Sequence, residues 1–393
     1  MKILITLSNF ALGGTESYTT TVAEGLERMG HEVTIFAPEA TDLGRRLAAS
    51  LGLCLVVGEL LPEDVDAVIA QDAGTAQMLA GRNPAPRMVF AIHGLASFEQ
   101  PPRGLDPAPT VIAFNDRIAG RAAGLAERPP VVRMTQPIDI ARFRPHSPVG
   151  GRPRRLLVLS NSLGPARLRM LQDACDDLGI ELARVGGAGA PRISVREEIA
   201  AADIVVGYGR SVLEGMAMAR PAYVWERGGG DGWVTPENYA ALEADGFSGA
   251  ATDDVIDAGR LREDLAAYRP ELGEFGFELV RRHHSREKHV EALGRILGEG
   301  TAPSRQDSAE TISLLVRSEK RSAGLAESAR IAHDALLSHV RDLGAKLVVA
   351  GDRTTAERAR REAAEAKLAE VLGSTSWRLT APLRRLTARL RGR

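Results

Sequence analysis

The chain has 393 residues, 44% of them hydrophobic and 26% charged, which is enough for two ordinary globular domains. A formal net charge of −1 lacks the basic excess of nucleic-acid-binding proteins, so we expect no nucleic-acid partner. Cys54 and Cys175 lie far apart in apolar sequence, which indicates free thiols in a reducing compartment rather than a disulfide framework.

The N-terminus predicts a first buried strand. Residues 2–8 are largely apolar, and the run ends at Ser8 and Asn9, which makes it too short for a signal peptide. Nowhere do 18 apolar residues follow one another, so we expect no transmembrane helix. The sequence therefore predicts a cytoplasmic protein whose contact with a membrane would be limited to the surface, at the inner face.

A strand, a glycine-containing loop, a helix and a second strand follow one another at the start of the chain. An amphipathic run from Tyr18 to Met29 ends at Gly30, and a β-rich stretch follows it. This order is typical of a βαβ unit. Further short apolar strands without strict alternation predict a parallel sheet covered on both faces, within a first domain at 1–145.

Residues 146–155 are rich in proline, glycine and arginine and predict a linker. The alternation of strands and helices then resumes, with helices expected at 165–178, 195–202 and 211–219. The second α/β domain is expected to span 156–300 and to end in a helix. The predicted fold class is therefore α/β, with two parallel-sheet domains.

The composition changes after residue 300. Residues 301–372 are rich in alanine, glutamate, arginine and leucine, and they predict a helical extension. Irregular heptads leave self-association through 305–371 open. Residues 373–393 form a basic tail with leucines at helical spacing: Leu379, Leu383, Leu386 and Leu390. With Trp377 and six arginines, residues 377–393 suit an anionic membrane surface; docking on the protein itself or on a partner is the alternative.

The loop of Gly13, Gly14, Thr15 and Glu16 leaves a predicted strand and enters a predicted helix. Its backbone N–H groups would point outward at the positive end of a helix dipole, and the glycines would let an anion approach closely. The pattern is not G-x-G-x-x-G, so a dinucleotide fingerprint is absent. The alternative is a plain turn in which Thr15 or Glu16 caps the helix.

His93 stands at the end of a predicted strand, where ligands of open α/β sheets collect. A histidine at such a place could donate a hydrogen bond to a substrate oxygen, or act as a general acid or base near neutral pH. A structural histidine that caps a loop is the alternative.

Two further stretches follow predicted strands. Residues 136–145 contain Pro137, Phe143 and Pro145, which predict a turn at an interdomain corner. Residues 226–239 hold four glycines and predict a loop whose backbone donors could hold a phosphate or sugar hydroxyls. A flexible surface loop is the alternative.

Glu214 is the one carboxylate in an apolar helical run. Ser211 lies three residues before it, as in a capping box, and in that role Glu214 would satisfy N–H groups at the helix start. Alternatively, Glu214 faces a cleft and accepts hydrogen bonds from vicinal hydroxyls such as those of a ribose. Arg210 at a helix start is disfavoured by the dipole, which hints at an anionic ligand or an acidic neighbour.

Taken in order, these motifs resemble the GT-B glycosyltransferases, specifically the large retaining group called family 4. The resemblance covers about residues 1–298 and rests on four segments: Gly13-Gly14-Thr15-Glu16, Gly30-His31-Glu32-Val33, Gln136 to Pro145 and Leu213 to Pro221. It implies two Rossmann-like domains facing each other across a cleft, with a nucleotide-sugar donor held mostly by the second. The tail is similar to the ends of some bacterial cell-surface polysaccharide enzymes.

The resemblance also implies roles for single residues. Glu214 would bind the ribose hydroxyls of the donor, and His93 would sit near the transferred sugar as the catalytic residue. Gly13 and Gly14 would lie against the donor diphosphate or the acceptor. The expected donor-binding residues are Gly13, Gly14, Arg167, Arg210, Ser211 and Glu214. No metal and no cofactor are expected, because the nucleotide-sugar is a co-substrate.

The sequence departs from the family pattern at two places. Gly207 stands where the first of two acids is usual. The usual Arg and Lys after the first strand of the second domain are not evident. Arg167 and Arg169 are displaced from that pair, and Arg210 could supply the missing positive charge. The donor sugar therefore stays open.

The sequence supports one leading hypothesis and two rivals. The leading one is a glycosyltransferase that moves a sugar from a nucleotide-sugar to a glycan or lipid-linked acceptor in cell-surface polysaccharide or glycolipid synthesis, with the retaining mechanism that the family implies. The first rival is a non-catalytic GT-B-like protein that binds nucleotide or scaffolds polysaccharide assembly. The second is a nucleotide-sugar epimerase, which would form product from the donor alone.

Overall fold

The computed structural model describes residues 1–305 with gaps at 83, 95–98, 103, 126–127, 146, 187–191, 227–228 and 253, and further along it describes Lys367. Apart from residues 301–305 and Lys367, the predicted helical extension at 301–372 lies outside the described residues, as does the predicted tail at 373–393. Among the described helices, none is long and apolar enough to cross a membrane.

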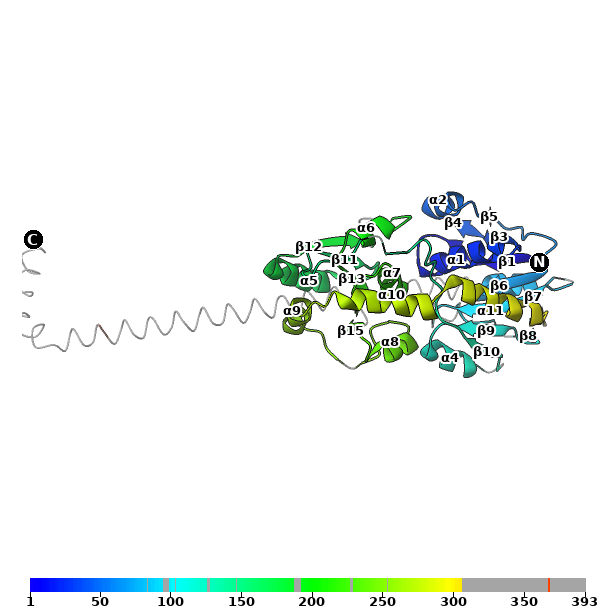
Figure 1. Ribbon diagram of the computed structural model, residues 1–393. Helices are drawn as coiled ribbons and strands as arrows, with labels where there is room; N and C mark the ends of the chain where they lie inside the picture. Colours follow the sequence, from blue (N-terminus) through cyan, green and yellow to red (C-terminus); the bar gives the residue numbers. More distant parts are fainter. Residues whose placement is uncertain are drawn as a thin grey trace, which may run out of the picture. The chain divides into compact units, whose positions relative to one another are not determined.

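The first part of the chain forms a seven-stranded sheet in which all neighbouring strands run parallel (Figure 1). Its order is β10-β9-β7-β6-β1-β3-β5. The strands are β1 (Lys2–Thr6), β3 (Glu32–Ala37), β5 (Cys54–Val57), β6 (Ala67–Ala70), β7 (Arg87–Ile92), β9 (Thr110–Ala113) and β10 (Val131–Arg133). Strand β6 is buried at every residue, as expected where helices cover both faces, so the predicted parallel sheet is confirmed.

Four helices follow strands of this sheet: α1 (Gly14–Arg28), α2 (Asp42–Ser50), α3 (Ala73–Ala80) and α4 (Asp116–Ala123). The side chains of Thr41, Asp72 and Asn115 each accept a hydrogen bond from a first-turn N–H group and so begin α2, α3 and α4. Two short strand pairs complete this part: β2 (Asn9–Phe10) with β4 (Glu39–Ala40), and β8 (Leu105–Asp106) with β16 (Ser304–Arg305).

The second sheet has five strands in the order β12-β11-β13-β14-β15. They are β11 (Arg155–Leu159), β12 (Glu181–Val185), β13 (Ile204–Gly207), β14 (Ala222–Glu226) and β15 (Gly229–Trp233). The first four run parallel, and β15 pairs antiparallel with β14. The loop predicted over 226–239 is therefore wrong for β15. This strand contains glycines with positive φ and few residues that favour strands, so its sequence does not predict it.

Seven helices accompany or follow the second sheet: α5 (Pro165–Leu178), α6 (Arg196–Ala200), α7 (Arg210–Ala217), α8 (Tyr239–Asp245), α9 (Ala258–Ala266), α10 (Glu271–His283) and α11 (Arg286–Glu299). The helix expected at 165–178 matches α5 residue for residue, and those expected at 195–202 and 211–219 correspond to α6 and α7. Two apolar cores, one on each face of the sheet, hold this part together.

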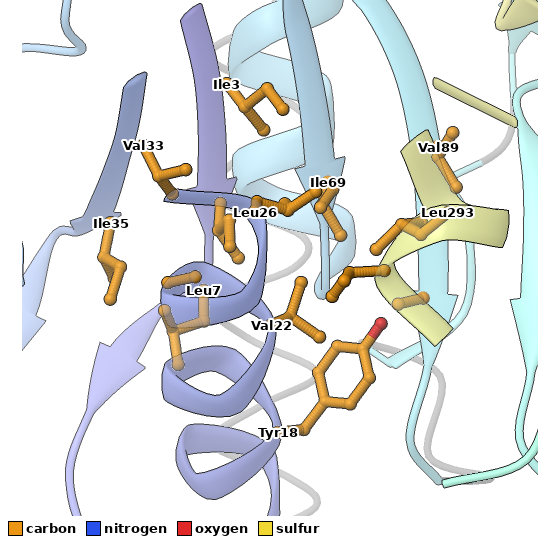
Figure 2. Close-up of a cluster of buried hydrophobic side chains, with 14 of the residues drawn as sticks. Ile3, Leu7, Tyr18, Val22, Leu26, Val33, Ile35, Ile69, Val89 and Leu293 are labelled. Carbon is orange, nitrogen blue, oxygen red and sulfur yellow. The ribbon is translucent and has the colours of Figure 1, made fainter. Parts of the chain in front are cut away.

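Helix α11 packs on the first sheet although it follows the second domain in the chain (Figure 1). Val290, Leu293 and Leu297 are buried in the core of the first domain. Figure 2 shows Leu293 on the yellow helix, among the labelled side chains of that core and near Val89. The predicted second-domain boundary at residue 300 is therefore wrong. The helical spacing of these residues indicates a buried face but does not say which sheet covers it.

The chain passes between the two domains through two segments that lie side by side. Ile138 N donates to His284 O at 2.7 Å, and Arg286 N donates to Ile138 O at 3.1 Å. Since Ile138 is already buried in the core of the second domain, the first crossing lies near residues 134–138. The predicted linker at 146–155 comes after this crossing: Ser147 accepts hydrogen bonds from Arg220 of the second domain, and Arg155 begins β11. The predicted interdomain corner does lie at the crossing.

We call residues 134–139 and 283–289 the hinge. A buried ion pair joins its two segments: Arg286 Nη1 donates to Asp139 Oδ2 at 2.5 Å, and neither side chain is more than 3% exposed. Asp139 Oδ1 accepts from two backbone N–H groups, each at 3.1 Å. Both carboxylate oxygens are thus hydrogen-bonded, which a buried charge requires.

Two hinge histidines each contact a backbone carbonyl of the hinge through Nδ1 and a tyrosine hydroxyl of one domain through Nε2. Each ring donates from Nδ1 to a backbone carbonyl of the hinge, at 3.0 Å for His289 and 2.9 Å for His284. Because a carbonyl can only accept, each Nδ1 carries the proton and each Nε2 is an acceptor. His289 Nε2 lies 3.3 Å from the Tyr18 hydroxyl of α1, and His284 Nε2 lies 2.9 Å from the Tyr239 hydroxyl of α8. Burial lowers the pKa of both imidazoles to about 4.

Candidate functional site

A pocket of about 530 Å³ lies between the first and second domains, within the range of ligand sites. We call it the cleft pocket. The start of α1 lines it from the first domain, and the start of α7 lines it from the second. Five residues predicted from the sequence line it: Gly13, Gly14, Arg210, Ser211 and Glu214. The predicted residues His93 and Arg167 do not line it.

The first-domain wall is a glycine turn that opens onto the pocket. Gly13 is the N-cap of α1, with no side-chain cap, and a Cβ on Gly14 would meet nothing within 4 Å. Glu16 Oε1 accepts from Ala11 N at 3.3 Å and so braces the loop before the helix. The predicted cap by Thr15 or Glu16 is therefore wrong, because Glu16 accepts from the loop before α1 and no side chain caps the helix, while the glycine backbone borders open space.

The second-domain wall is α7, which begins one residue earlier than predicted. Its N-cap is Gly209, whose φ of +54° favours glycine, and no side chain caps the helix. Ser211 is the second helical residue and cannot serve as N-cap. The capping-box prediction for Ser211 and Glu214 is therefore wrong, because the turn at Gly209 moves the helix start.

Glu214 pairs with Arg210, one helical turn before it. Arg210 Nε donates to Glu214 Oε1 at 2.9 Å, and the two side chains are 9% and 11% exposed. The acidic neighbour of this helix-start arginine is thus Glu214 itself. Burial raises the pKa of Glu214, and the positive charge of Arg210 opposes that rise. Glu214 lines the pocket, and no described residue donates a hydrogen bond to its Oε2.

The other guanidinium nitrogens of Arg210 also bind the protein. Nη1 donates to Pro137 O at 2.7 Å, and Nη2 donates to Thr21 Oγ1 at 2.8 Å. The charge of Arg210 borders the pocket, but its hydrogen bonds hold three parts of the chain together. Its side chain is therefore a bridge between elements before any ligand arrives.

His93 follows β7 and stacks among aromatic rings at centroid distances of 4.9 and 5.0 Å. Its Nε2 lies 2.7 Å from Gln71 Oε1. Gln71 Nε2 donates to the Thr19 hydroxyl, which itself donates to a backbone carbonyl. Gln71 Oε1 must therefore accept, and His93 Nε2 carries the proton.

Burial, with a smaller contribution from the charge of Arg210, lowers the pKa of His93 to about 3. The lowered pKa favours a neutral imidazole at pH 7, and the role of His93 as a general acid or base stays a prediction. With Nε2–H bound to Gln71, the remaining Nδ1 can accept a hydrogen bond but cannot donate one. The place of His93 near a transferred sugar stays a prediction.

Arg167 lies at a separate hollow of about 370 Å³, near the carboxyl end of β14. Its guanidinium carbon is 5.7 Å from the centre of the Trp225 ring, at cation–π distance. Arg167 and Glu214 therefore border different hollows, and the structure does not bring them together.

Sequence reasoning missed a buried carboxylate on the same edge of the second sheet. Ser160 Oγ and Ser162 Oγ donate to Glu226 Oε1 at 2.6 and 2.7 Å, and Ser160 lines the cleft pocket. Ser160 follows β11, and Glu226 is the last residue of β14. The signal that singled out His93, a polar residue at the carboxyl end of a strand, would have found both.

Gly207, where the family's first acid would stand, has no room for a side chain. A Cβ there would lie 2.9 Å from Leu159 O and 3.0 Å from Ser211 Cβ. The backbone of the neighbouring strand thus selects glycine at the end of β13. Within the described part of the chain, no group of three or more His, Cys, Asp and Glu side chains could hold a metal ion.

No protein-family model and no curated protein matches the sequence. Solved structures do match. The HepE protein of Anabaena, in complex with UDP and glucose, is 14% identical with a TM-score of 0.50; the match covers 76% of this chain and 100% of that one. The pneumococcal O-GlcNAc transferase GtfA, in complex with UDP and GlcNAc, is 10% identical with a TM-score of 0.50, over 76% of this chain and 99% of that one.

At these identities the similarity is one of fold. The chain has the GT-B architecture, with two Rossmann-like domains on either side of a cleft and a crossing helix that returns to the first domain. The predicted fold class is confirmed.

Proposed function

We propose that the chain is a glycosyltransferase that moves a sugar from a nucleotide-sugar donor to a glycan or lipid-linked acceptor. The observation that carries the proposal is the cleft pocket, which the glycine turn of α1 lines from the first domain and Glu214 lines from the second. Similarity in fold to two proteins whose structures hold UDP and a sugar supports it.

The donor would lie between these two walls. Glu214 Oε2 would accept a hydrogen bond from a ribose hydroxyl, and Ser211 borders the same side. Gly13 and Gly14 would lie against the donor diphosphate or the acceptor, where the first-turn N–H groups and dipole of α1 favour negative charge. The departing diphosphate would thus be stabilised by positioning and electrostatics.

We further propose that the reaction needs neither metal nor cofactor, because the α1 N-terminus and the arginines that border the pocket supply positive charge. Chelation with EDTA should then leave the initial rate unchanged. A loss of rate that Mg²⁺ or Mn²⁺ restores would contradict this part of the proposal.

The wider setting rests on the sequence resemblance. It comprises membership in the family 4 group, retention of anomeric configuration, cell-surface polysaccharide or glycolipid synthesis and a cytoplasmic location at the inner membrane face. Residues 377–393 would bind an anionic membrane near a lipid-linked acceptor, and 305–371 would self-associate. Co-sedimentation with anionic liposomes should be lost in a chain that ends at residue 372; equal binding would exclude the membrane role.

The direct test is a panel of nucleotide-sugars, with and without glycan and lipid-linked acceptors. We expect one donor to be consumed with a transferred product, and Glu214→Ala to abolish that reaction. Glu278→Ala, which changes an exposed glutamate on α10, is the matched control and should be fully active.

A second candidate is a non-catalytic GT-B protein that binds a nucleotide. It is favoured by Gly207, which has no room for an acid, and by Arg210, which already holds one oxygen of Glu214. Binding of a nucleotide without turnover for every donor and acceptor pair would support this candidate over the transferase.

A further inference from the structure

Arg210 breaks a local rule of helix formation. It is the first residue of α7, where the positive end of the helix dipole repels a cation. Its glutamate partner lies at i+4, and a cation placed before an anion is the weaker order for such a pair. Local preference therefore does not explain an arginine at this position, and its contacts outside α7 do.

Those contacts join three separate parts of the chain. Nη1 donates to the hinge carbonyl of Pro137 at 2.7 Å, and Nη2 donates to the Thr21 hydroxyl of α1 at 2.8 Å. Nε donates to Glu214 within α7. One side chain thus ties the first domain, the hinge and the second-domain wall of the cleft pocket.

The Thr21 hydroxyl is oriented for this contact. It donates to Ser17 O at 2.6 Å, so its lone pairs are left to accept from Arg210. Only an arginine fits all three acceptors, because its planar guanidinium spreads N–H donors in fixed directions, whereas a lysine ammonium is a single point.

We propose that Arg210 is a positioning residue that couples the closed arrangement of the two domains to the orientation of the Glu214 carboxylate. When the two domains move apart, Arg210 loses its hydrogen bond to Thr21, and the orientation of its guanidinium is no longer fixed. The carboxylate then loses the fixed hydrogen bond that aims Oε2 at the pocket. Donor binding and domain closure would favour each other through this one side chain.

This inference deepens the proposed function, and its part on donor binding rests on that function. The first test, on the distance between the domains, needs no nucleotide. Spin labels on Cys54, an exposed thiol of β5, and on Asp173→Cys, an exposed position of α5, report the distance between the domains by pulsed electron resonance. Cys175 is buried, and burial raises its pKa to about 11, so it should stay unlabelled.

In the ligand-free protein we expect one narrow distance distribution. Arg210→Met should broaden it or add a longer distance, and Thr21→Val should do so to a smaller extent, since it removes only the first-domain acceptor. Arg210→Lys should behave like Thr21→Val, because the charge stays while the three-way contact is lost.

Arg220→Lys is the matched control. Arg220 is 1% exposed and donates to Ile199 O, Ala200 O and Ser147, all within the second domain. This variant should lose as much thermal stability as Arg210→Lys but keep the narrow distribution. The same broadening in Arg220→Lys and Arg210→Lys would overturn the proposal, and so would an unchanged distribution in Arg210→Met.

The second arm titrates each variant with UDP as the probe. If the wild-type chain binds UDP, Arg210→Met should weaken binding about 10- to 100-fold, and UDP should narrow the distribution of Thr21→Val. Equal affinity in wild type and Arg210→Met would overturn the coupling. If no nucleotide binds the wild-type chain, the donor site of the proposed function fails, and the ligand-free distances alone decide the role of Arg210.

Discussion

Two buried arginine–carboxylate pairs in the described part of the chain differ in how completely their charges are satisfied by hydrogen bonds. In the hinge, Arg286 and Asp139 are 0% and 3% exposed, and every oxygen of the carboxylate accepts a hydrogen bond. In the cleft, Arg210 and Glu214 are 9% and 11% exposed, Glu214 lines the pocket, and no described residue donates a hydrogen bond to its Oε2. Both carboxylate oxygens of Asp139 accept hydrogen bonds within the protein, whereas only one oxygen of Glu214 accepts a hydrogen bond from a described residue.

This difference separates a structural role from a functional one. A buried charge is costly unless hydrogen bonds satisfy it, so an incompletely satisfied pair beside a pocket is a candidate for binding a ligand. The hinge pair fixes the place where the chain crosses between domains. The cleft pair is positioned by contacts with α1 and the hinge, and its remaining oxygen is where we expect a ligand.

The largest effect of a single substitution should come from breaking the hinge pair. Asp139→Ala leaves the buried Arg286 guanidinium with only the exposed Glu287 as an acidic partner, and we expect the free energy of unfolding to fall by about 4 kcal/mol. Urea denaturation measures it. The exposed pair of Arg281 and Glu278 is the control, since Glu278→Ala there should cost less than about 0.5 kcal/mol. Equal losses in the two variants would show that burial does not set the difference.

Acid should weaken the hinge next. The pKa of His284 and of His289 is lowered to about 4 by burial, against an ordinary value near 6.5. The neutral rings therefore stabilise the fold above pH 6.5, and this stability is lost as the pH falls toward 4. A shift of this size corresponds to about 3 kcal/mol for each histidine. Urea denaturation from pH 8 to 4.5 should show the loss.

The charges that face these rings give a sharper test. His283 and Arg133 also lower the pKa of His284, and Arg210 and His284 lower that of His289. Arg210→Met should therefore raise the pKa of His289 more than that of His284, as NMR titration of the ring protons would show. An unchanged pKa of His289 would mean that the cleft charge does not reach the hinge.

The layers of the fold were predictable because they depend on short-range patterns. Short apolar runs without alternation predicted the parallel sheets, and the helix at 165–178 follows from its proline start and glycine end. The docking of α11 was not predictable, since Val290 and Leu293 show that one face is buried but not what covers it. Strand β15 was not predicted because its glycines do not favour a strand by themselves, and they are extended here because they pair with β14.

The candidate site also combines features that local sequence predicts with features that depend on long-range contacts. That Gly13, Gly14 and Glu214 line one pocket was predictable because strand ends and helix starts carry a local signal; their roles in donor binding stay predictions. The pairing of Arg210 with Glu214 is visible as an i, i+4 spacing, but Ser211 gives an equally good capping-box pattern. Only the turn at Gly209 decides between them. The contact of Arg210 with Thr21 spans 189 positions, and no local pattern encodes it.

A smaller effect is expected when the cleft pair loses its charge. Glu214→Gln keeps the shape but leaves Arg210 with a neutral partner, so the free energy of unfolding should fall by about 2 kcal/mol. The affinity for UDP should fall about tenfold, which is about 1.4 kcal/mol. Glu226→Gln, within hydrogen-bond reach of two serines, tests whether any buried glutamate on this edge has the same effect. An equal loss of UDP affinity in both variants would contradict a specific role of Glu214 in binding the nucleotide.

The smallest effect concerns the tyrosines that bind the hinge histidines. Tyr18→Phe and Tyr239→Phe each remove one hydroxyl that donates to a neutral imidazole, which should cost about 1 kcal/mol of unfolding free energy. Tyr239 should matter more, because its hydroxyl lies 2.9 Å from His284 Nε2 whereas that of Tyr18 lies 3.3 Å from His289 Nε2. Thermal unfolding of the two single variants and the double variant measures this. Since each hydroxyl holds the hinge to a different domain, their losses should add, and a double-variant loss well below the sum would mean that the two contacts form one coupled network.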